Sequence, residues 1–228
     1  MKDHASLPYS LPAMPDEERV ARAAAMREKL ASRRSCRYFS DVPVPREVIE
    51  QAILAAGSAP NGANHQPWHF TVITSPGKKR AIREAAEAEE RRFYGENGGD
   101  PKASEEWLSA LAPIGTDAQK PFLETAPYLI AVFAQRKGGI DEDGQTQNYY
   151  VNESVGIACG MLIATLHEAG LATLTHTPSP MGFLRELCGR PEHEKPLMIV
   201  VTGLPAEGAT VPAHAVRKKP LEQISSWL

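Results

Sequence analysis

The chain lacks long hydrophobic runs and has few cysteines. It contains no run of about 18 apolar residues, the length that a membrane-spanning helix needs. Its first residues, Met1-Lys2-Asp3-His4 followed by prolines, lack the apolar core of a signal peptide. Its three cysteines, Cys36, Cys159 and Cys188, are an odd number without a C-x-x-C pair, which argues against a disulfide framework. We therefore expect a cytoplasmic protein without a membrane partner.

The chain also lacks an excess of charge of one sign. It carries 25 basic and 28 acidic residues, for a net charge of −3, so no global field recruits nucleic acid. The basic triplet Arg217-Lys218-Lys219 is too short to change this expectation. With 228 residues, of which 42% are hydrophobic, the chain can bury the core of one domain.

Several common catalytic motifs are absent. The sequence has no G-x-S-x-G elbow and no Walker loop, and Gly57 to Gly62 does not match the G-x-G-x-x-G dinucleotide pattern. His65 and His69 are four residues apart, but Pro67 between them denies them the shared helical face that a zinc pair requires. We expect no metal site.

What is present is an alternation of helical and strand patterns. An extended leader (1–15) precedes a domain that we expect to span 16–203, followed by a proline-rich arm (204–228). Strands alternating with helices predict a three-layer α/β arrangement, without fixing strand order. Helices are expected at 16–32, 46–56, 78–94 and 149–169, and strands at 68–74, 127–134, 172–177 and 196–203.

Two features mark a segment near the middle of the chain. The helix expected at 78–94 is very polar at its far end, Glu87 to Arg92, which predicts an exposed or mobile stretch. Glycines 95, 98 and 99 then interrupt the pattern, and 100–119 is helical in pieces with little apolar periodicity. We expect a lid at about 88–120.

An arginine-rich segment, Arg33-Arg34-Ser35-Cys36-Arg37, follows the first helix. Its forked donors and serine hydroxyl suit a phosphate dianion. Cations at a helix end are also favoured by the helix dipole, so this segment alone is more typical of a solvated helix terminus than of a ligand site. A second segment, Ala59-Pro60-Asn61-Gly62-Ala63-Asn64-His65-Gln66-Pro67-Trp68, is suited to bringing backbone close to a ligand.

The order of these two segments resembles the nitroreductase superfamily of FMN-dependent reductases, and within it most closely the iodotyrosine deiodinases. The resemblance runs from about Ala31 to Ile224. It implies an α/β (α+β) fold with a mixed sheet flanked by helices. It also implies an intertwined homodimer around the helix at 149–169, with the arm 204–228 crossing to the partner subunit. The alternative for that helix is an ordinary buried core helix.

The resemblance also implies an FMN site. The arginine segment matches the residues that hold the FMN phosphate and ribityl chain, and Pro60 to Gly62 match the loop beside the flavin ring. Near the C-terminus either Arg217 or Lys218 matches a further basic contact. The implied cofactor-binding residues are Arg33, Arg34, Ser35, Cys36, Arg37, Pro60, Asn61, Gly62, Thr175, His176, Thr177, Arg217 and Lys218.

Two positions are implied to take part in catalysis. The Ala63 backbone N–H matches the donor to the substrate phenolate, an oxyanion-hole type of contact. Thr175 matches a hydroxyl at flavin N5 that biases the flavin towards one-electron steps, and Thr177 is then a second flavin contact. By composition alone, Thr173 to Thr177 is more typical of a solvent-facing edge strand than of a flavin contact.

Three residues point to the substrate. Glu90 and Tyr94 are four apart, on one face of a helix, and Lys120 follows the glycine break. Each alone is typical of a solvated surface. In iodotyrosine deiodinases the matching trio binds the amino acid end of the substrate, the carboxylate accepting from the α-ammonium while the lysine and tyrosine bind the α-carboxylate.

The resemblance therefore implies FMN-dependent reductive dehalogenation of halotyrosines, in which NADPH, another NAD(P)H-linked donor or a flavodoxin- or ferredoxin-type protein is the reductant. One alternative is a nitroreductase or quinone reductase of the same fold that uses hydride transfer. Another is a flavin-binding dimer without catalysis.

Overall fold

The computed structural model describes residues 6–95, 105–140 and 146–228. The chain forms two compact units, residues 1–33 and 34–228. In the first, α1 (Asp16–Ser32) begins with three acidic residues and has Lys29 in its last turn, which suits the helix dipole. None of its residues is buried within the unit.

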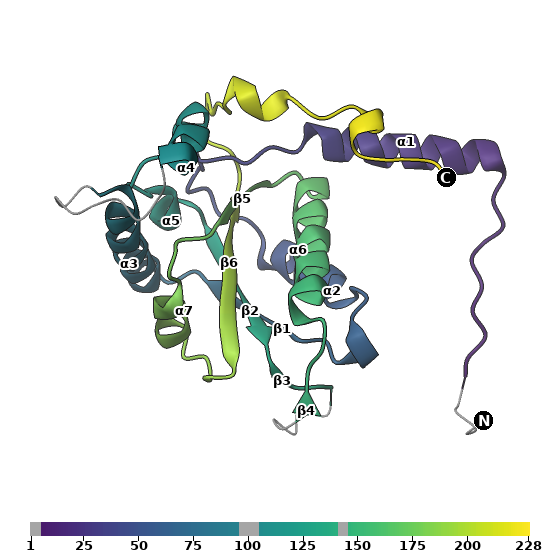
Figure 1. The fold of residues 1–228 in the computed structure, drawn as a ribbon, viewed down its shortest axis with the longest axis horizontal. Helices are drawn as coiled ribbons and strands as arrows, with labels where there is room; N and C mark the ends of the chain where they lie inside the picture. The colour runs from purple at the N-terminus through teal and green to yellow at the C-terminus, as the bar shows by residue number, and fades with distance from the viewer. Residues whose placement is uncertain (1–5, 96–104, 141–145) are drawn as a thin grey trace. The chain divides into compact units, whose positions relative to one another are not determined.

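The second unit contains the sheet and the remaining helices (Figure 1). Short 3-10 helices are η1 (Gly62–Asn64), η2 (Ala112–Ile114), η3 (Ala213–Val216) and η4 (Leu221–Gln223). The main elements are α2 (Arg46–Gly57), β1 (Trp68–Ile73), α3 (Pro76–Tyr94), α4 (Glu105–Leu111), α5 (Phe122–Thr125), β2 (Tyr128–Gln135), β3 (Lys137–Gly138), β4 (Thr146–Gln147), α6 (Val151–Glu168), β5 (Ala172–His176), α7 (Gly182–Leu187) and β6 (Glu194–Gly203).

The main sheet has four antiparallel strands in the order β1-β2-β6-β5. At its β5 edge, Ser35 forms a parallel bridge with Thr173, which makes the sheet mixed. The apolar run of β6 lies between β2 and β5, as its composition predicted. The expected α/β fold class is therefore confirmed.

Helices cover both faces of this sheet. Along β2, Leu129, Ala131 and Phe133 pack into a core with α3, α5 and α7, whereas Ile130 and Val132 pack into a core with α2 and α6. This alternation follows from the period of two in a strand, and because both faces are covered the strand is apolar throughout. Figure 1 shows α2 and α6 on one side of the sheet and α3, α5 and α7 on the other.

One face of α6 remains uncovered by the rest of the described chain. Val155, Ala158 and Cys159 are buried, but Gly156 and Gly160 are exposed, and Ile157 is 46% exposed. A Cβ atom added at either glycine meets no atom within 4 Å. The outward face of this helix is thus flat enough for another helix to approach closely.

The polar end of α3 differs from its prediction. Glu87, Glu89 and Glu90 are half-buried rather than exposed. Ion pairs with basic side chains explain the difference, because Glu87 pairs with Arg83 at 2.7 Å and Glu89 with Arg92 at 2.8 Å. The central part of the predicted lid, 96–104, lies outside the described residues.

The helix α3 is bounded by the residues that helix ends favour. Pro76 occupies its start, where a missing N–H costs nothing, and Gly95 ends it with a φ of 72°. Across the ranges that the structure describes, no helix combines the length and the apolar character that a bilayer crossing needs.

Candidate functional site

Backbone pairing on two sides holds the segment after Arg34. The Cys36 N–H donates to the Thr173 carbonyl at 3.0 Å, beside the Ser35 bridge to β5. Farther along, the Ser40 N–H donates to the Leu204 carbonyl at 2.9 Å. The arginine segment is therefore joined to the threonine strand, two regions far apart in the sequence.

Side chains alternate along this segment. Cys36 is 6% exposed, lies in the hydrophobic core, and its thiol donates to the Tyr38 carbonyl at 3.1 Å. Ser35 and Arg37, on either side of it, are half-buried. Of the predicted cofactor contacts, Cys36 can thus offer only backbone atoms, whereas Ser35 and Arg37 can offer side chains.

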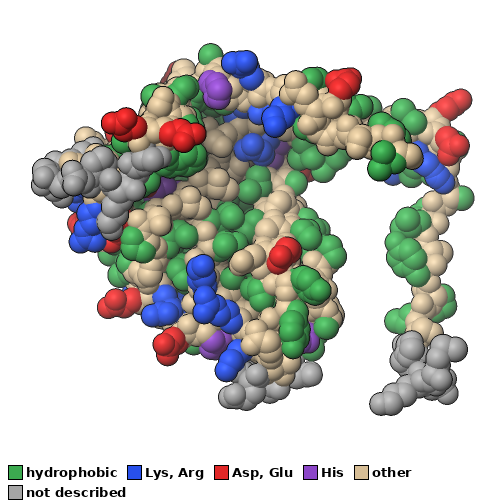
Figure 2. Space-filling view, viewed as in Figure 1, with side chains coloured by type: hydrophobic (Ala, Val, Ile, Leu, Met, Phe, Trp, Pro, Cys, Tyr) green, Lys and Arg blue, Asp and Glu red, His purple; other side chains and the backbone are tan. Residues whose placement is uncertain are grey.

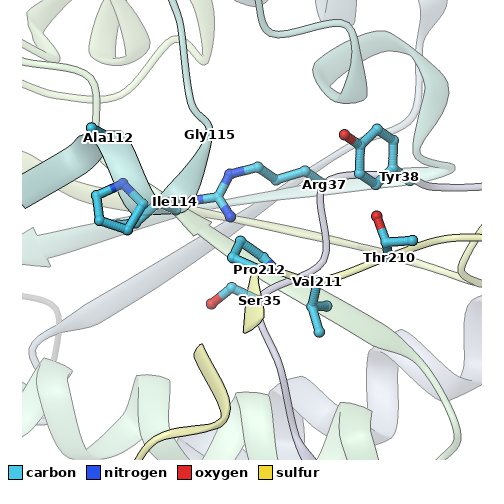
Figure 3. A pocket seen from close by; sticks show the side chains of 10 residues that line it. Ser35, Arg37, Tyr38, Ala112, Ile114, Gly115, Thr210, Val211 and Pro212 are labelled. Atoms are coloured by element: carbon cyan, nitrogen blue, oxygen red, sulfur yellow. The ribbon is translucent and has the colours of Figure 1, made fainter. Parts of the chain in front are cut away.

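A cavity of about 290 Å³ lies beside Ser35 and Arg37. Figure 3 shows the Arg37 side chain extending toward Ile114 and Gly115. Burial lowers the pKa of Arg37, although the nearby Tyr38 and Tyr94 oppose this shift. In the described parts of the chain no carboxylate pairs with this guanidinium. The other lining residues, which no motif marked in the sequence, are Ala112, Pro113, Thr210, Val211 and Pro212.

The three predicted substrate residues meet. The Lys120 ammonium lies 3.3 Å from a carboxylate oxygen of Glu90 and 5.9 Å from the centroid of the Tyr94 ring. Lys120 is 3% exposed, so it is not the solvated surface cation that its sequence context alone suggests. Burial raises the pKa of Glu90, and the neighbouring Lys120 partly offsets this.

Thr116 and Asp117 complete this cluster, which sequence reasoning missed. The Lys120 ammonium donates to the Thr116 hydroxyl at 3.2 Å and to the Asp117 carbonyl. The Tyr94 hydroxyl donates to the Thr116 carbonyl at 3.5 Å. Only the position of these two residues a few places before Lys120 could have indicated their role.

His176 lies close to the same cluster. It is 7% exposed, its ring packs edge-to-face against Phe122, and its Nε2 has no hydrogen-bond partner among the described residues. Burial lowers its pKa to about 3, with the positive charges of Lys120 and Arg37 adding to the effect. His176 is therefore a neutral imidazole with an open nitrogen beside two cations.

Thr175 and Thr177 flank His176 and are both exposed. Because side chains alternate along a strand, the two hydroxyls share the orientation opposite to that of His176. This exposure fits the predicted edge position, and it leaves both hydroxyls available to a ligand.

The loop before β1 is braced by Asn61. Its side-chain oxygen accepts from the Gln66 N–H at 2.8 Å, and its amide donates to the Ala59 carbonyl at 3.0 Å. Both bonds lie within the loop. Asn61 thus shapes the loop, and one amide hydrogen remains for a ligand.

Ala63 has an unusual backbone conformation in this loop, with φ 52° and ψ 23°. An alanine in the left-handed region costs about 1 kcal/mol, so surrounding contacts must hold it there. Gly62, next to Ala63, packs closely on neighbouring backbone, because a Cβ atom added there would lie 3.1 Å from the Tyr149 carbonyl oxygen. The loop is therefore fixed against the start of α6.

Within one chain, the structure does not bring Ala63 to the cluster of Glu90, Tyr94 and Lys120. Its loop packs at the start of α6, on the α2 and α6 side of the sheet. Lys120 directly precedes α5, on the opposite side. Figure 1 shows the loop between α2 and β1 far from α4 and α5. The expectation of a single site containing both holds only if a second chain contributes.

The remaining predicted basic residues are near chain ends. Arg217 and Lys218 are exposed, and the Lys218 ammonium donates to the Ala215 carbonyl at 2.9 Å. Arg33 ends the first unit and Arg34 begins the second. His65 and His69 lie in a loop and on β1, as Pro67 predicted, and the described residues include no group of three or more potential metal ligands.

Comparisons with known proteins agree on one family. The sequence model of the Nitroreductase family matches residues 30–204. An iodotyrosine deiodinase of Haliscomenobacter hydrossis is 49% identical over 208 residues, covering 91% of each chain. Iodotyrosine deiodinase 1 of Homo sapiens is 42% identical over 219 residues, 96% of this chain and 73% of the human one.

Solved structures give the same result. A structure described as oxidized iodotyrosine deiodinase bound to FMN and 3-iodo-L-tyrosine superposes with a TM-score of 0.68 and 28% identity. The superposition covers 80% of this chain and 90% of that one. The family match over most of the second unit, the relatives and the shared fold together establish that this chain belongs to the nitroreductase family.

Proposed function

We propose that this protein is an FMN-dependent oxidoreductase that removes halide reductively from halotyrosines, as iodotyrosine deiodinases do. The observation that carries the proposal is the buried cluster of Glu90, Tyr94 and Lys120. It offers a carboxylate, an ammonium and a phenol at one place, which suits both poles of an amino acid zwitterion. The identity of 49% to a named iodotyrosine deiodinase supports the same conclusion.

The residues present fit FMN. Arg37 is a half-buried guanidinium without a carboxylate partner among the described residues, and Ser35 beside the same cavity offers a hydroxyl. A phosphate dianion would give the Arg37 guanidinium a negatively charged partner. Arg33 and Arg34, directly before them in sequence, and either Arg217 or Lys218 are the further basic residues that we assign to the phosphate.

When the substrate binds, Glu90, Tyr94 and Lys120 exchange their present partners for groups of the substrate. The Glu90 carboxylate accepts hydrogen bonds from the α-ammonium, and the Lys120 ammonium and the Tyr94 hydroxyl donate to the α-carboxylate. Lys120 and Glu90 already neutralise each other at 3.3 Å. A zwitterion inserted between them preserves charge balance, whereas an uncharged phenol leaves the pair as it is.

We propose that the site forms between two copies of the chain. Ala63 and Lys120 lie on opposite sides of the sheet in one subunit, so the N–H that meets the phenolate comes from the partner. The exposed face of α6, with Gly156, Ile157 and Gly160, supports a homodimer around this helix. The arm after Gly203, where Trp227 is 90% exposed, also needs a surface to cover.

The reaction consumes two electrons and one proton: the carbon–halogen bond breaks, a carbon–hydrogen bond forms, and tyrosine and halide leave. Reduced FMN, when bound, would supply the two electrons. The Ala63 N–H stabilises the phenolate oxygen. The neutral His176 adds no positive charge beside Lys120 and Arg37 at working pH. We assign the contact with flavin N5 to Thr175 and a second flavin contact to Thr177.

Free cysteines support a reducing compartment, which we propose to be the cytoplasm. Cys36, Cys159 and Cys188 form no disulfide, and burial raises the pKa of Cys159 to about 11, so this thiol is inert. An NAD(P)H-linked donor or a flavodoxin- or ferredoxin-type protein is the proposed source of electrons.

The test is stoichiometric reoxidation. FMN-loaded protein is reduced anaerobically and titrated with 3-iodotyrosine while flavin absorbance and released iodide are measured. We expect one iodide and one tyrosine per oxidised flavin. Tyrosine serves as the control and must leave the flavin reduced. Reoxidation by nitrofurazone but not by iodotyrosine would replace this proposal with a nitroreductase that uses hydride transfer.

A further inference from the structure

The described lining of a second and larger cavity includes none of the residues assigned above to flavin and halotyrosine, although it shares the loop before β1 with Asn61 and Ala63. Its volume is about 590 Å³, against about 290 Å³ beside Arg37. It opens between the loop before β1, the start of β1, the end of β2 with β3, and the turn before β6. A volume of this size is typical of sites for small organic molecules and exceeds what a halide ion fills.

Basic and imidazole side chains dominate its lining. They are His65, His69, Lys137, Arg190 and His193, from four separate segments. Figure 2 shows Lys, Arg and His side chains gathered over the end of the sheet where β6 begins. Among the described residues that line this cavity, Glu194 is the only one with a carboxylate.

Glu194 cannot neutralise this lining. It is 1% exposed, and Arg190 donates to both of its oxygens at 2.6 Å. Gln135 adds a third hydrogen bond at 2.9 Å. Burial alone would raise the pKa of Glu194, but the hydrogen bonds from Arg190 and Gln135 lower it. The carboxylate is therefore ionised, and both of its oxygens already accept hydrogen bonds from these two residues. Among the described residues, no carboxylate forms an ion pair with Lys137 on the cavity wall.

Arg190 retains donors for a ligand. The bonds to Glu194 use its Nε and one Nη2 hydrogen, and a guanidinium carries five N–H groups. Because Glu194 fixes the plane of this guanidinium, the remaining donors are held in place. Burial and the positive Arg190 lower the pKa of His69, against an opposing effect of Glu194.

We propose that this cavity binds an organic phosphate of the nucleotide type. Phosphate oxygens accept from Lys137 and from the free donors of Arg190, with the imidazoles of His69 and His193 as further donors. Trp68, which also lines the cavity, offers an aromatic surface for a planar base. The ligand is either a mononucleotide or the nucleotide part of a dinucleotide electron donor.

The cavity is joined to the loop that holds Ala63. The His65 ring nitrogen Nδ1 lies 2.8 Å from the Asn148 side-chain oxygen, and Gln66, the next lining residue, donates its N–H to Asn61. A ligand that contacts His65 and Gln66 therefore acts on the conformation of that loop. By linkage, halotyrosine and the organic phosphate must change each other's affinity by the same factor. This coupling rests on the proposed function, whereas the cavity's binding of phosphate does not.

The experiment is calorimetric titration of the FMN-loaded protein with ADP, pyrophosphate and inorganic phosphate. Flavin absorbance is followed to verify that FMN stays bound. We expect saturable binding of one ADP per subunit, weakened about tenfold by Lys137→Glu. Lys195→Glu is the matched control, because Lys195 follows Glu194 in β6 but lines a different cavity. It should leave ADP binding unchanged.

Three outcomes would overturn the proposal: no saturable binding of ADP, equal weakening by the two lysine variants, or inorganic phosphate binding as tightly as ADP. A titration with NADP⁺ then distinguishes a dinucleotide ligand from a mononucleotide ligand. Tighter binding of NADP⁺ than of ADP identifies a dinucleotide donor, and equal binding identifies a mononucleotide. A negative result in this titration does not affect the reoxidation of reduced flavin by iodotyrosine. The phosphate-binding proposal and the deiodinase proposal can therefore be refuted independently.

Discussion

The ammonium of Lys120 lies 3.3 Å from the carboxylate of Glu90, and only 3% of Lys120 is exposed. Removing one member of such a pair leaves the other charge buried without its partner, which typically costs several kcal/mol. A ligand that brings both a carboxylate and an ammonium can replace both partners. We therefore expect this pair to favour zwitterions over simple phenols.

Replacing Glu90 by Gln should raise the dissociation constant of 3-iodotyrosine by about tenfold or more, because one pole of recognition is lost. Flavin content should not change. Flavin fluorescence quenching measures both quantities. Glu84→Gln is the matched control, since Glu84 is exposed on the same helix. Binding of 2-iodophenol, which lacks the zwitterion, should be equal in both variants, and a parallel loss there would contradict the assigned role.

Two inactive variants should restore activity when mixed, if Ala63 and Lys120 of one site come from different subunits. Ala63→Pro removes the backbone N–H and also displaces the loop, because proline cannot adopt the φ of 52° found there, and Lys120→Ala removes the ammonium. After denaturation and refolding of an equal mixture, half the dimers are mixed, and each has one intact site. Deiodination should recover to about a quarter of the wild-type value. Each variant refolded alone is the control, and no recovery despite mixed dimers would place the whole site in one subunit.

Thr175→Ala should lower deiodination about tenfold relative to nitroaromatic reduction, the change expected for one lost hydrogen bond in the reaction. Halotyrosine binding should be unaffected, because Glu90 and Lys120 are unchanged. Thr177→Ala is the comparison, since both hydroxyls are exposed with the same orientation. The ratio of the two activities is the readout. A larger effect at Thr177 would assign the flavin N5 contact to that residue instead.

His176 should make the fold less stable in acid. Its pKa is lowered from 6.5 to about 3, chiefly by burial. Between these two values His176 is protonated in the unfolded chain but neutral in the folded chain. This contribution to stability is complete above pH 6.5 and is lost as the pH falls toward 3. His176→Leu should therefore reduce the acid loss by on the order of 2 kcal/mol at about pH 4.5. Urea unfolding at neutral and acid pH measures it, and the exposed His214→Gln should match the wild type.

Gly203→Ala should destabilise the second unit. A Cβ atom at Gly203 lies 2.4 Å from the ring of Pro127, which cannot move aside without its backbone. Overpacking of this kind costs about 1–3 kcal/mol. The midpoint of urea unfolding measures the loss. Gly77→Ala is the control, because a Cβ there meets no atom within 4 Å, and equal midpoints would refute the clash.

The local sequence was enough to place most elements. The apolar run before Gly203 predicted a central strand, and the pattern from Arg46 to Ala56 predicted α2. These predictions succeeded because periodicity depends on neighbours in the chain and on which faces are buried. The polar end of α3 misled for the same reason. Charge alone indicated exposure, while ion pairs to Arg83, Arg92 and Lys120 allow burial.

By itself, the sequence determined the residue types of the site: the arginines around Ser35, the loop before Trp68, and Glu90, Tyr94 and Lys120. Only the tertiary structure decided which of them meet. Strand order brings Ser35 beside Thr173 and puts Ala63 on the other side of the sheet from Lys120. The tertiary structure also places Lys137 and Arg190 around one cavity. Such meetings depend on packing between segments far apart in the chain, where short-range patterns carry no information.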